Sequence, residues 1–266
     1  MLTLILSKPK FNTGCRKEFR LFMSIESLME KLGLMWSDTL LANSKASRKE
    51  WVKQYGKSME RIRVLPNNIT SPSFDKPKKR KDLLQEFSLE ADRFLIATAS
   101  ILEPHKNLEC LLNAFSAVSN LKATLFILGE GALKDSLKRL ADTLGIGQRI
   151  IFTGWREDVR ELLQGMDLFI FPSLREGMSE SLLEATTCQL PCLVSSIPEN
   201  MEVIRNPEQH FPPEQPQILA QKITRLMKDP EYYEALLQST QLDRDRFVFD
   251  WEGEITLETE ELLKQR

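Results

Sequence analysis

Two glutamates, Glu176 and Glu184, stand eight residues apart in the segment FIFPSLREGMSESLLEATTCQLP, which spans residues 169–191. The first follows an apolar run that predicts a buried strand (167–173), and the second lies in a predicted helix (181–188). Gly177 directly follows Glu176. Carboxylate oxygens accept several hydrogen bonds each, so two of them where a strand gives way to a helix are suited to holding a polar ligand.

The same residues also allow a purely structural interpretation. Ser181 precedes Glu184 by three residues, as in a capping box, in which a serine and a glutamate side chain cap the amides of a helical first turn. Glu176 would then be an ordinary acid in a loop. The spacing by itself leaves both interpretations open.

The elements around these glutamates alternate between strand and helix. Strands that are apolar along their whole length are buried on both faces, and intervening helices imply parallel crossovers. We therefore expect an α/β fold with a doubly wound parallel sheet, which binds ligands outside the carboxyl ends of its strands. The predicted strands are 93–100, 123–129, 149–154, 167–173 and 191–196, with an amphipathic helix over 133–145 that ends at Gly145, a short helix over 159–165 and helix-rich sequence after residue 217.

The first 72 residues predict too few elements for a second complete α/β domain. They contain a long amphipathic helix (16–35), a strand (38–44), a helix (45–56) and a strand (61–68). We therefore divide the chain into an N-terminal remnant, 1–72, and a main domain, 73–266. The polar stretch 68–82 predicts a linker, whose basic run is either a solvated hinge or a signal for a membrane surface or a cellular address.

Bulk properties narrow the function classes. The chain of 266 residues is 42% hydrophobic and 28% charged, with a formal net charge of −2. This balance gives no general attraction to nucleic acid, and no apolar run is long enough to span a bilayer. The four cysteines and two histidines lack the paired spacing of zinc sites, so we expect buried thiols in a reduced, cytoplasmic protein.

Two further motifs do not indicate a catalytic or binding site when each is taken alone. Lys106 has the position of an ordinary surface lysine. Gly129 and Gly131 could begin a dinucleotide-binding loop, but the pattern G-x-G-x-x-G needs a small residue where Lys134 stands. Binding of a nicotinamide dinucleotide is therefore not expected.

Several ordered motifs together resemble the retaining GT-B glycosyltransferases of group 1 (family 4). Their signature is P-S-x-x-E-G-x-x-x-S-x-x-E-A, in which the two acids form an E-x7-E motif. The likeness extends over residues 38–260, through RVLPNN (63–68), ILEPHKNLECLLNAF (101–115), LFILGEGALKDSLKRLADTLGIGQRIIFTGW (125–155) and RFVFDWE (246–252). The residues that fill the signature are Pro172, Ser173, Glu176, Gly177, Ser181, Glu184 and Ala185.

This resemblance implies a site for a nucleotide-diphosphate sugar in the domain 73–266. It assigns catalytic roles to Glu176, which would hold a hydroxyl of the transferred sugar, and to Lys106, which would neutralise the leaving phosphate. Glu184 would accept hydrogen bonds from the ribose. The donor would also lie against the amides of the helix near Ser181. The remaining residues expected at the donor are Gly177, Met178, Ser179, Gly129, Gly131 and Gly154.

The same resemblance implies transfer with retention of configuration and no metal or other cofactor. The acceptor is unspecified: a lipid, a glycan or a small metabolite. A cytoplasmic location follows, with peripheral attachment to a membrane as an alternative. A partner chain would supply the missing acceptor domain, and nucleic acid is not an expected partner.

The sequence departs from the family pattern at Ile101, where an arginine usually accompanies the phosphate lysine, and at Gln189, where a glycine usually stands. Together with the short N-terminal part, these departures keep two alternatives open. One is a non-catalytic or truncated nucleotide-sugar-binding module, and the other is a nucleotide-sugar epimerase of the same fold.

Overall fold

A computed structural model describes residues 4–5, 40–55, 62–70, 73–118 and 122–264. The chain forms two compact units, residues 1–66 and residues 67–266. Each unit is described by itself.

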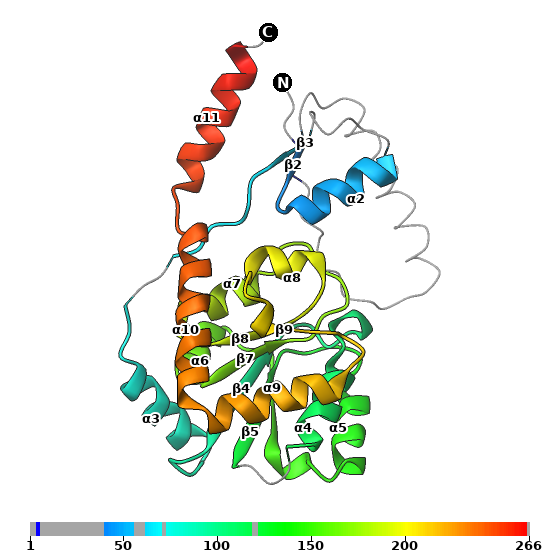
Figure 1. Cartoon of the computed structure of the whole chain (residues 1–266), viewed down its shortest axis with the longest axis vertical. Coiled ribbons are helices and arrows are strands. Elements are labelled where there is room, and N and C mark those ends of the chain that lie inside the picture. The colour runs from blue at the N-terminus through cyan, green and yellow to red at the C-terminus, as the bar shows by residue number, and fades with distance from the viewer. Residues whose placement is uncertain (1–3, 6–39, 56–61, 71–72, 119–121, 265–266) are drawn as a thin grey trace. The chain divides into compact units, whose positions relative to one another are not determined.

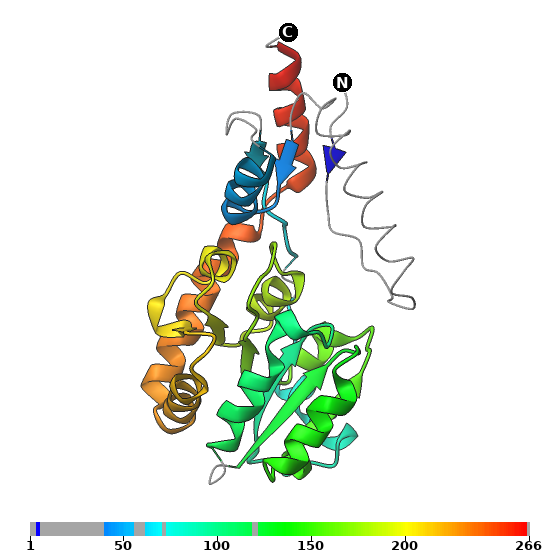
Figure 2. The same cartoon turned by 90° about the vertical axis from the view of Figure 1, so that its right-hand side faces the viewer.

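The first unit has a small parallel sheet and one described helix. Its strands are β1 (Leu4–Ile5), β2 (Leu40–Ala42) and β3 (Ile62–Val64), in that spatial order. Helix α2 (Lys45–Tyr55) lies against β2 and β3 (Figure 2). Its Trp51 packs on buried apolar residues of the two strands. The strand, helix and strand predicted between residues 38 and 68 are therefore present, whereas the predicted helix 16–35 lies outside the described residues.

The second unit is built on a six-stranded, fully parallel sheet (Figure 1). The spatial order is β6-β5-β4-β7-β8-β9, which is the order 3-2-1-4-5-6 of doubly wound dinucleotide-binding folds. The strands are β4 (Phe94–Ala99), β5 (Ala123–Leu128), β6 (Ile150–Gly154), β7 (Leu168–Phe171), β8 (Cys192–Ser195) and β9 (His210–Phe211). The first five match the strands predicted from the sequence, and β9 was not predicted.

Apolar side chains on both faces of the sheet explain why its strands carry continuous apolar runs. Successive residues point to opposite faces. In β7, Leu168 and Ile170 belong to one core cluster, and Phe169 and Phe171 belong to the other. Every residue of β5 and β7 is buried. The sheet is therefore the middle layer of three, as the sequence predicted.

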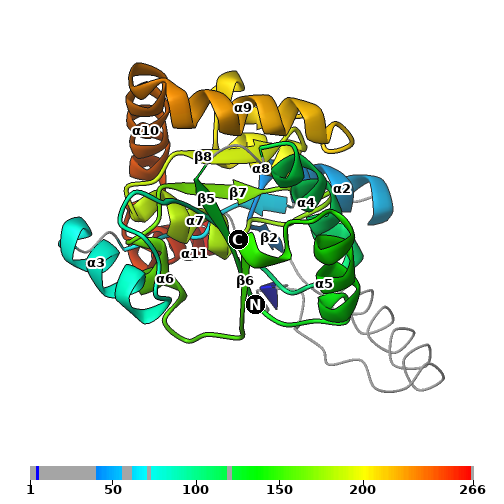
Figure 3. The same ribbon diagram turned by 90° about the horizontal axis from the view of Figure 1, so that it is seen from below.

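Helices cover both faces of this sheet (Figure 3). One core cluster includes side chains of α4, α5, α9 and α10, and the other includes side chains of α3, α6 and α7. These helices are α3 (Lys76–Glu86), α4 (Leu108–Ser116), α5 (Lys134–Thr143), α6 (Val159–Leu163), α7 (Glu180–Thr187), α9 (Pro216–Lys228) and α10 (Pro230–Arg244), and the unit also has α8 (Pro198–Val203) and α11 (Trp251–Lys264).

The end of α5 confirms the predicted role of Gly145. This glycine has φ +68°, and its N–H donates to the carbonyl of Asp142 at 3.0 Å. The next residue, Ile146, donates to the carbonyl of Ala141 at 2.9 Å. The two bonds form a Schellman motif, in which glycine adopts the left-handed conformation at little cost.

The prediction of a linker over residues 68–82 is wrong in its second half, because α3 begins at Lys76. Asp75 caps the helix, and its side chain accepts a hydrogen bond from the Lys78 amide at 3.0 Å. Arg80 forms an ion pair with Asp167 at 2.8 Å, with both side chains mostly buried. Lys76 Nζ donates to the carbonyl of Gln189 at 2.6 Å. Much of the basic run therefore fixes α3 to the sheet instead of forming a solvated hinge.

Three of the four cysteines are buried free thiols, namely Cys110, Cys188 and Cys192. Burial raises the pKa of the Cys188 thiol to about 11. Cys15 lies outside the described residues. None of the helices in the described part of the chain combines the length and the apolar character that a bilayer crossing requires.

Candidate nucleotide-sugar site

The site forms where the order of the strands reverses. Strands β4 and β7 are neighbours at the centre of the sheet, but the chain leaves them toward β5 on one side and β8 on the other. Loops that follow such strands diverge and leave a crevice at the carboxyl edge. Lys106 follows β4 in the short 3-10 helix η2 (Pro104–Lys106), and Glu176 follows β7.

Lys106 and Glu176 meet across this crevice. The Lys106 Nζ atom lies 2.5 Å from Glu176 Oε1, and the two side chains are 13% and 9% exposed. The ammonium group also lies 5.5 Å from the centre of the Phe171 ring. A charged pair this poorly hydrated interacts more strongly than one on an open surface. The sheet thus brings together the two predicted catalytic residues, which are 70 positions apart in the chain.

Asn107 fixes the loops that carry the pair. Its backbone is left-handed, with φ +53°. Its Nδ2 atom donates to the carbonyl of Pro172 at 3.2 Å and to that of Pro213 at 2.8 Å. The Leu174 amide also donates to the His105 carbonyl at 2.8 Å. These bonds connect the chain after β4 to the chain after β7 and after β9.

His105 lies next to Lys106 and interacts electrostatically with the Lys106–Glu176 pair, and it was not among the residues predicted from the sequence. Its Nδ1 atom lies 3.4 Å from Glu103 Oε2. Burial lowers the pKa of the imidazole, and the charge of Lys106 acts in the same direction, against the opposing effects of Glu176 and Glu103. The sequence feature that could have identified His105 is its position next to Lys106.

Two serine hydroxyls at the ends of the central strands were not assigned a contact from the sequence, although Ser173 fills the family signature. Ser100 follows β4 and Ser173 follows β7. Both Oγ atoms are buried, and neither has a hydrogen-bond partner among the described residues. Buried hydroxyls without a partner are uncommon in folded proteins, so each is a candidate contact for a polar ligand.

The predicted glycines lie at the ends of the neighbouring strands. A side chain on Gly129 would place its Cβ 2.0 Å from the Ser100 carbonyl oxygen, and one on Gly131 would come within 2.6 Å of Leu102 backbone atoms. Gly154 has φ +75°, and its carbonyl accepts a hydrogen bond from the Gly129 amide at 2.9 Å. Close approach of adjacent loops is therefore one reason why these positions are glycines.

The capping-box interpretation of Ser181 and Glu184 is wrong in this structure. Helix α7 begins at Glu180, and its N-cap is Ser179, whose Oγ accepts a hydrogen bond from the Leu182 amide at 3.3 Å. Ser181 is already inside the helix, with its Oγ 3.1 Å from that of Ser179. The first turn of α7 nevertheless starts near the carboxyl end of β7, as predicted.

Met178 and Gly177 occupy the loop between Glu176 and α7. Met178 is 8% exposed, and its Sδ atom accepts a hydrogen bond from the Asn67 amide at 3.3 Å. Its side chain belongs to the apolar core on the α7 side of the sheet. Gly177 is half-buried.

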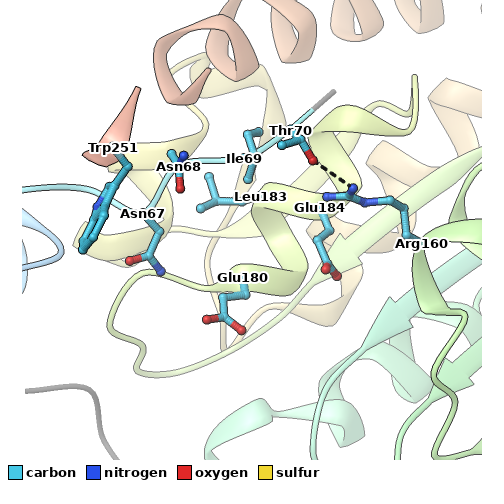
Figure 4. Close-up of a pocket in the computed structure, with 9 residues that line it drawn as sticks. All are labelled: Asn67, Asn68, Ile69, Thr70, Arg160, Glu180, Leu183, Glu184 and Trp251. Atoms are coloured by element: carbon cyan, nitrogen blue, oxygen red, sulfur yellow. Dashed lines mark hydrogen bonds between the residues drawn. The ribbon is translucent and has the colours of Figure 1, made fainter. Parts of the chain in front are cut away.

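Glu184 lines a pocket of about 490 Å³ beside α7 (Figure 4). Glu180 lies one turn before it, so the two carboxylates share a face of the helix. Across the pocket, Arg160 Nη1 donates to Thr70 Oγ1 at 3.4 Å. The other lining residues are Asn67, Asn68, Ile69, Leu183 and Trp251.

The two departures from the expected pattern have different surroundings. Ile101 is 45% exposed and lies directly after Ser100 at the end of β4. Gln189 follows the C-cap of α7 with φ +53°, a conformation that suits glycine. Gln189 therefore occupies a backbone position at which a glycine would be less strained.

A family profile described as "Glycosyl transferases group 1" matches residues 79–242. The chain belongs to this family. The match covers β4 to β9, the loops that carry Lys106 and Glu176, and helix α7, which carries Glu184.

Individual glycosyltransferases match a comparable part of the chain. The Escherichia coli UDP-Gal:alpha-D-GlcNAc-diphosphoundecaprenol alpha-1,3-galactosyltransferase is 32% identical over 152 residues, which are 55% of this chain and 39% of that protein. A Campylobacter jejuni N-acetylgalactosamine-N,N'-diacetylbacillosaminyl-diphospho-undecaprenol 4-alpha-N-acetylgalactosaminyltransferase is 29% identical over 153 residues, 57% of this chain and 40% of that protein. The matched part is thus about two fifths of these relatives' length.

Solved structures confirm the predicted fold. The crystal structure of Anabaena Alr3699/HepE in complex with UDP and glucose aligns with a TM-score of 0.73 and 24% identity. The alignment covers 86% of this chain and 64% of that one. The second unit therefore has the doubly wound architecture of a GT-B glycosyltransferase.

No group of three or more His, Cys, Asp or Glu side chains within the described ranges is arranged to hold a metal ion. Lys106 brings a positive charge to the crevice.

Proposed function

We propose that this chain binds a nucleotide-diphosphate sugar and transfers its hexosyl group to an acceptor with retention of configuration, without a metal. Residues 73–266 would form the donor-binding domain and residues 1–72 a remnant of an acceptor domain. The observation that carries the proposal is the Lys106–Glu176 pair at the reversal point of the sheet. Membership of the group 1 family and the UDP-sugar ligands of related structures support it.

The arrangement of charges suits a diphosphate joined to a sugar. Lys106 would neutralise the negative charge that develops on the leaving diphosphate. Glu176 uses its Oε1 atom for Lys106, so Oε2 would accept a hydrogen bond from a sugar hydroxyl. In the first turn of α7 the Leu182 amide donates to Ser179 Oγ, and the amides of Glu180 and Ser181 would face the diphosphate. Glu184 would accept hydrogen bonds from the ribose.

The transfer itself needs no external base in this arrangement. The bond between the anomeric carbon and the diphosphate oxygen breaks as the acceptor oxygen bonds to the same face of that carbon. The proton of the acceptor hydroxyl passes to the departing phosphate oxygen. Lys106 and the helix amides stabilise the charge on that phosphate throughout.

Calorimetric titration with UDP, GDP and ADP tests donor binding. We expect the wild-type chain to bind at least one of them. Lys106→Met should weaken binding by about 10- to 100-fold, because a hydrogen bond to a charged group contributes about 1.5–3 kcal/mol. Glu184→Ala should also weaken it. Lys122→Met, which removes an exposed lysine ahead of β5, is the control and should leave the affinity unchanged.

The absence of heat with all three nucleotides at millimolar concentration would refute the donor site. Binding that is insensitive to both site variants would refute the assigned residues. Turnover of a nucleotide sugar without any acceptor would instead favour an epimerase.

Ile101 gives the non-catalytic alternative a specific basis. An uncharged sec-butyl side chain, 45% exposed, stands where the family resemblance places a second cation. If the loss of that charge limits donor affinity, Ile101→Arg should tighten nucleotide binding by about tenfold. The same titration measures this effect, and Ile101→Leu is the matched control. An unchanged affinity in Ile101→Arg would show that this position does not face the diphosphate.

A further inference from the structure

Besides Glu184, the pocket beside α7 contains polar groups that the proposed donor contacts do not use. One end holds Glu184, Arg160 and Thr70. The other end holds Asn67 and Trp251, with Glu180 between the two ends (Figure 4). In the close-up, the side chains of Asn67, Glu180 and Glu184 extend toward the same side of the pocket.

The Asn67 end adjoins the loop that would hold the transferred sugar. The Asn67 amide donates to Met178 Sδ at 3.3 Å, and Met178 is two residues after Glu176. The Glu184 end would hold the ribose, which is separated from the transferred sugar by the diphosphate. An acceptor must approach the anomeric carbon, so the Asn67 end is the side of the pocket that is suited to receive it.

The lining of this end has the chemistry of a carbohydrate site. Trp251 is half-buried and offers the flat apolar surface on which the C–H face of a pyranose can pack. Asn67 supplies both a donor and an acceptor, and the exposed Glu180 carboxylate accepts from hydroxyls. At this end the Glu180 carboxylate disfavours a free phosphate, since the cation Arg160 lies at the other end, and a lipid chain would leave these polar groups without partners. The volume of about 490 Å³ is ordinary for a small-molecule site.

Hydrogen bonds hold the two sides of this end together. Asn68 Nδ2 donates to the Phe249 carbonyl at 3.3 Å. The Ile69 amide donates to the Phe247 carbonyl at 2.8 Å. The segment 67–70 is therefore attached to the chain just before Trp251. Such attachment lowers the entropy lost when a ligand is bound between them.

We propose that Asn67, Glu180 and Trp251 form an acceptor subsite that binds the terminal pyranose of a glycan. The proposal rests on the proposed function, because it takes the position of the donor sugar from it. It names the acceptor class as a carbohydrate and places part of its recognition in the same unit as the donor site.

Saturation-transfer NMR on the full chain tests the subsite, with methyl glycosides of glucose, galactose and N-acetylglucosamine as probes, each with and without UDP. We expect transfer to the ring protons of at least one sugar. Trp251→Leu and Glu180→Gln should each reduce this signal at least fivefold, while the calorimetric affinity for UDP changes less than twofold. Trp155→Leu removes a tryptophan that is 68% exposed and lies outside the pocket, and it should leave the sugar signal unchanged.

Glu180→Gln keeps the helical first turn, so it remains informative if Trp251→Leu fails to fold. The proposal is overturned if no probe receives saturation, or if neither variant reduces the signal. Loss of UDP affinity in Glu180→Gln would also overturn it, because that residue would then serve the donor. Failure of the wild type to bind UDP would count against the donor site alone, since the sugar signal is also measured without nucleotide.

Discussion

The ion pair between Lys106 and Glu176 should be coupled far more strongly than an exposed pair of similar length. The perturbation is a double-mutant cycle of Lys106→Met, Glu176→Gln and the combined variant. Each single change leaves one charged or polar group nearly buried without its partner. The combined variant removes both charges, so it should be less destabilised than the sum of the single variants.

The structure places the coupling free energy of Lys106 and Glu176 between two limits. Removing one partner of a fully buried pair costs about 3–5 kcal/mol, and an exposed pair contributes about 0–1 kcal/mol. The Lys106 and Glu176 side chains are 13% and 9% exposed, with 2.5 Å between Nζ and Oε1. We therefore expect a coupling free energy of about 2–3 kcal/mol.

Urea unfolding of the four proteins measures this coupling from the shifts in midpoint. A second cycle on Lys122 and Asp92 is the control, because that pair has a similar length of 2.7 Å but side chains that are 65% and 60% exposed. Its coupling should be too small to resolve. If the Lys106 and Glu176 effects add within about 0.5 kcal/mol, the reasoning that links burial to strong pairing at this crevice is wrong.

Three further predictions concern stability. Gln189→Gly should stabilise the chain by up to about 1 kcal/mol in urea unfolding, because relief of the left-handed backbone exceeds the entropy cost of glycine; destabilisation would contradict this. Gly129→Ala should lower the free energy of unfolding by at least about 3 kcal/mol, since its Cβ would lie 2.0 Å from the Ser100 carbonyl oxygen. Gly145 has φ +68° but open space around it, so Gly145→Ala should lower the free energy of unfolding by about 1 kcal/mol. Equal losses in the two variants would contradict the packing argument. The stability advantage of the wild type over Cys188→Ala should shrink between about pH 9 and 11, because the unfolded thiol ionises near pH 9 while the folded thiol, with its pKa raised to about 11, keeps its proton. A pH-independent difference in chemical unfolding would argue against that burial effect.

The central sheet was predictable because its strands are apolar along their whole length. Burial on both faces leaves this signature in the sequence of β5 and β7, whatever surrounds them. The two-residue strand β9 is too short to show any period. Its single fully buried side chain, Phe211, does not differ in pattern from an isolated apolar residue in a loop.

Helix α3 was missed because distant residues hold it in place. Its sequence, KPKKRKDLLQE, has few apolar residues and no clear amphipathic period. Arg80 depends on Asp167, and Lys76 depends on the carbonyl of Gln189. Contacts with partners about 90 to 110 positions away leave no trace in a local pattern, so composition alone favoured a linker.

The candidate site was predictable where residue type and spacing carry the chemistry. Lys106 and Glu176 were assigned from ordered motifs, and the structure places them in contact. The start of α7 was placed one residue too late, because Ser179 and Ser181 are both acceptable caps and the local sequence does not decide between them. The buried hydroxyl of Ser100 required knowledge of its neighbours in space.

The bonds of Asn107 have a consequence for how the crevice can vary among related proteins. A single amide group joins two proline carbonyls that follow two different strands of the sheet, Pro172 after β7 and Pro213 after β9. The distance between Lys106 and Glu176 is therefore set by the spacing of the strands and not by the length of the loops. Insertions beyond these anchors can reshape what surrounds the crevice while the distance between its two charges stays constant.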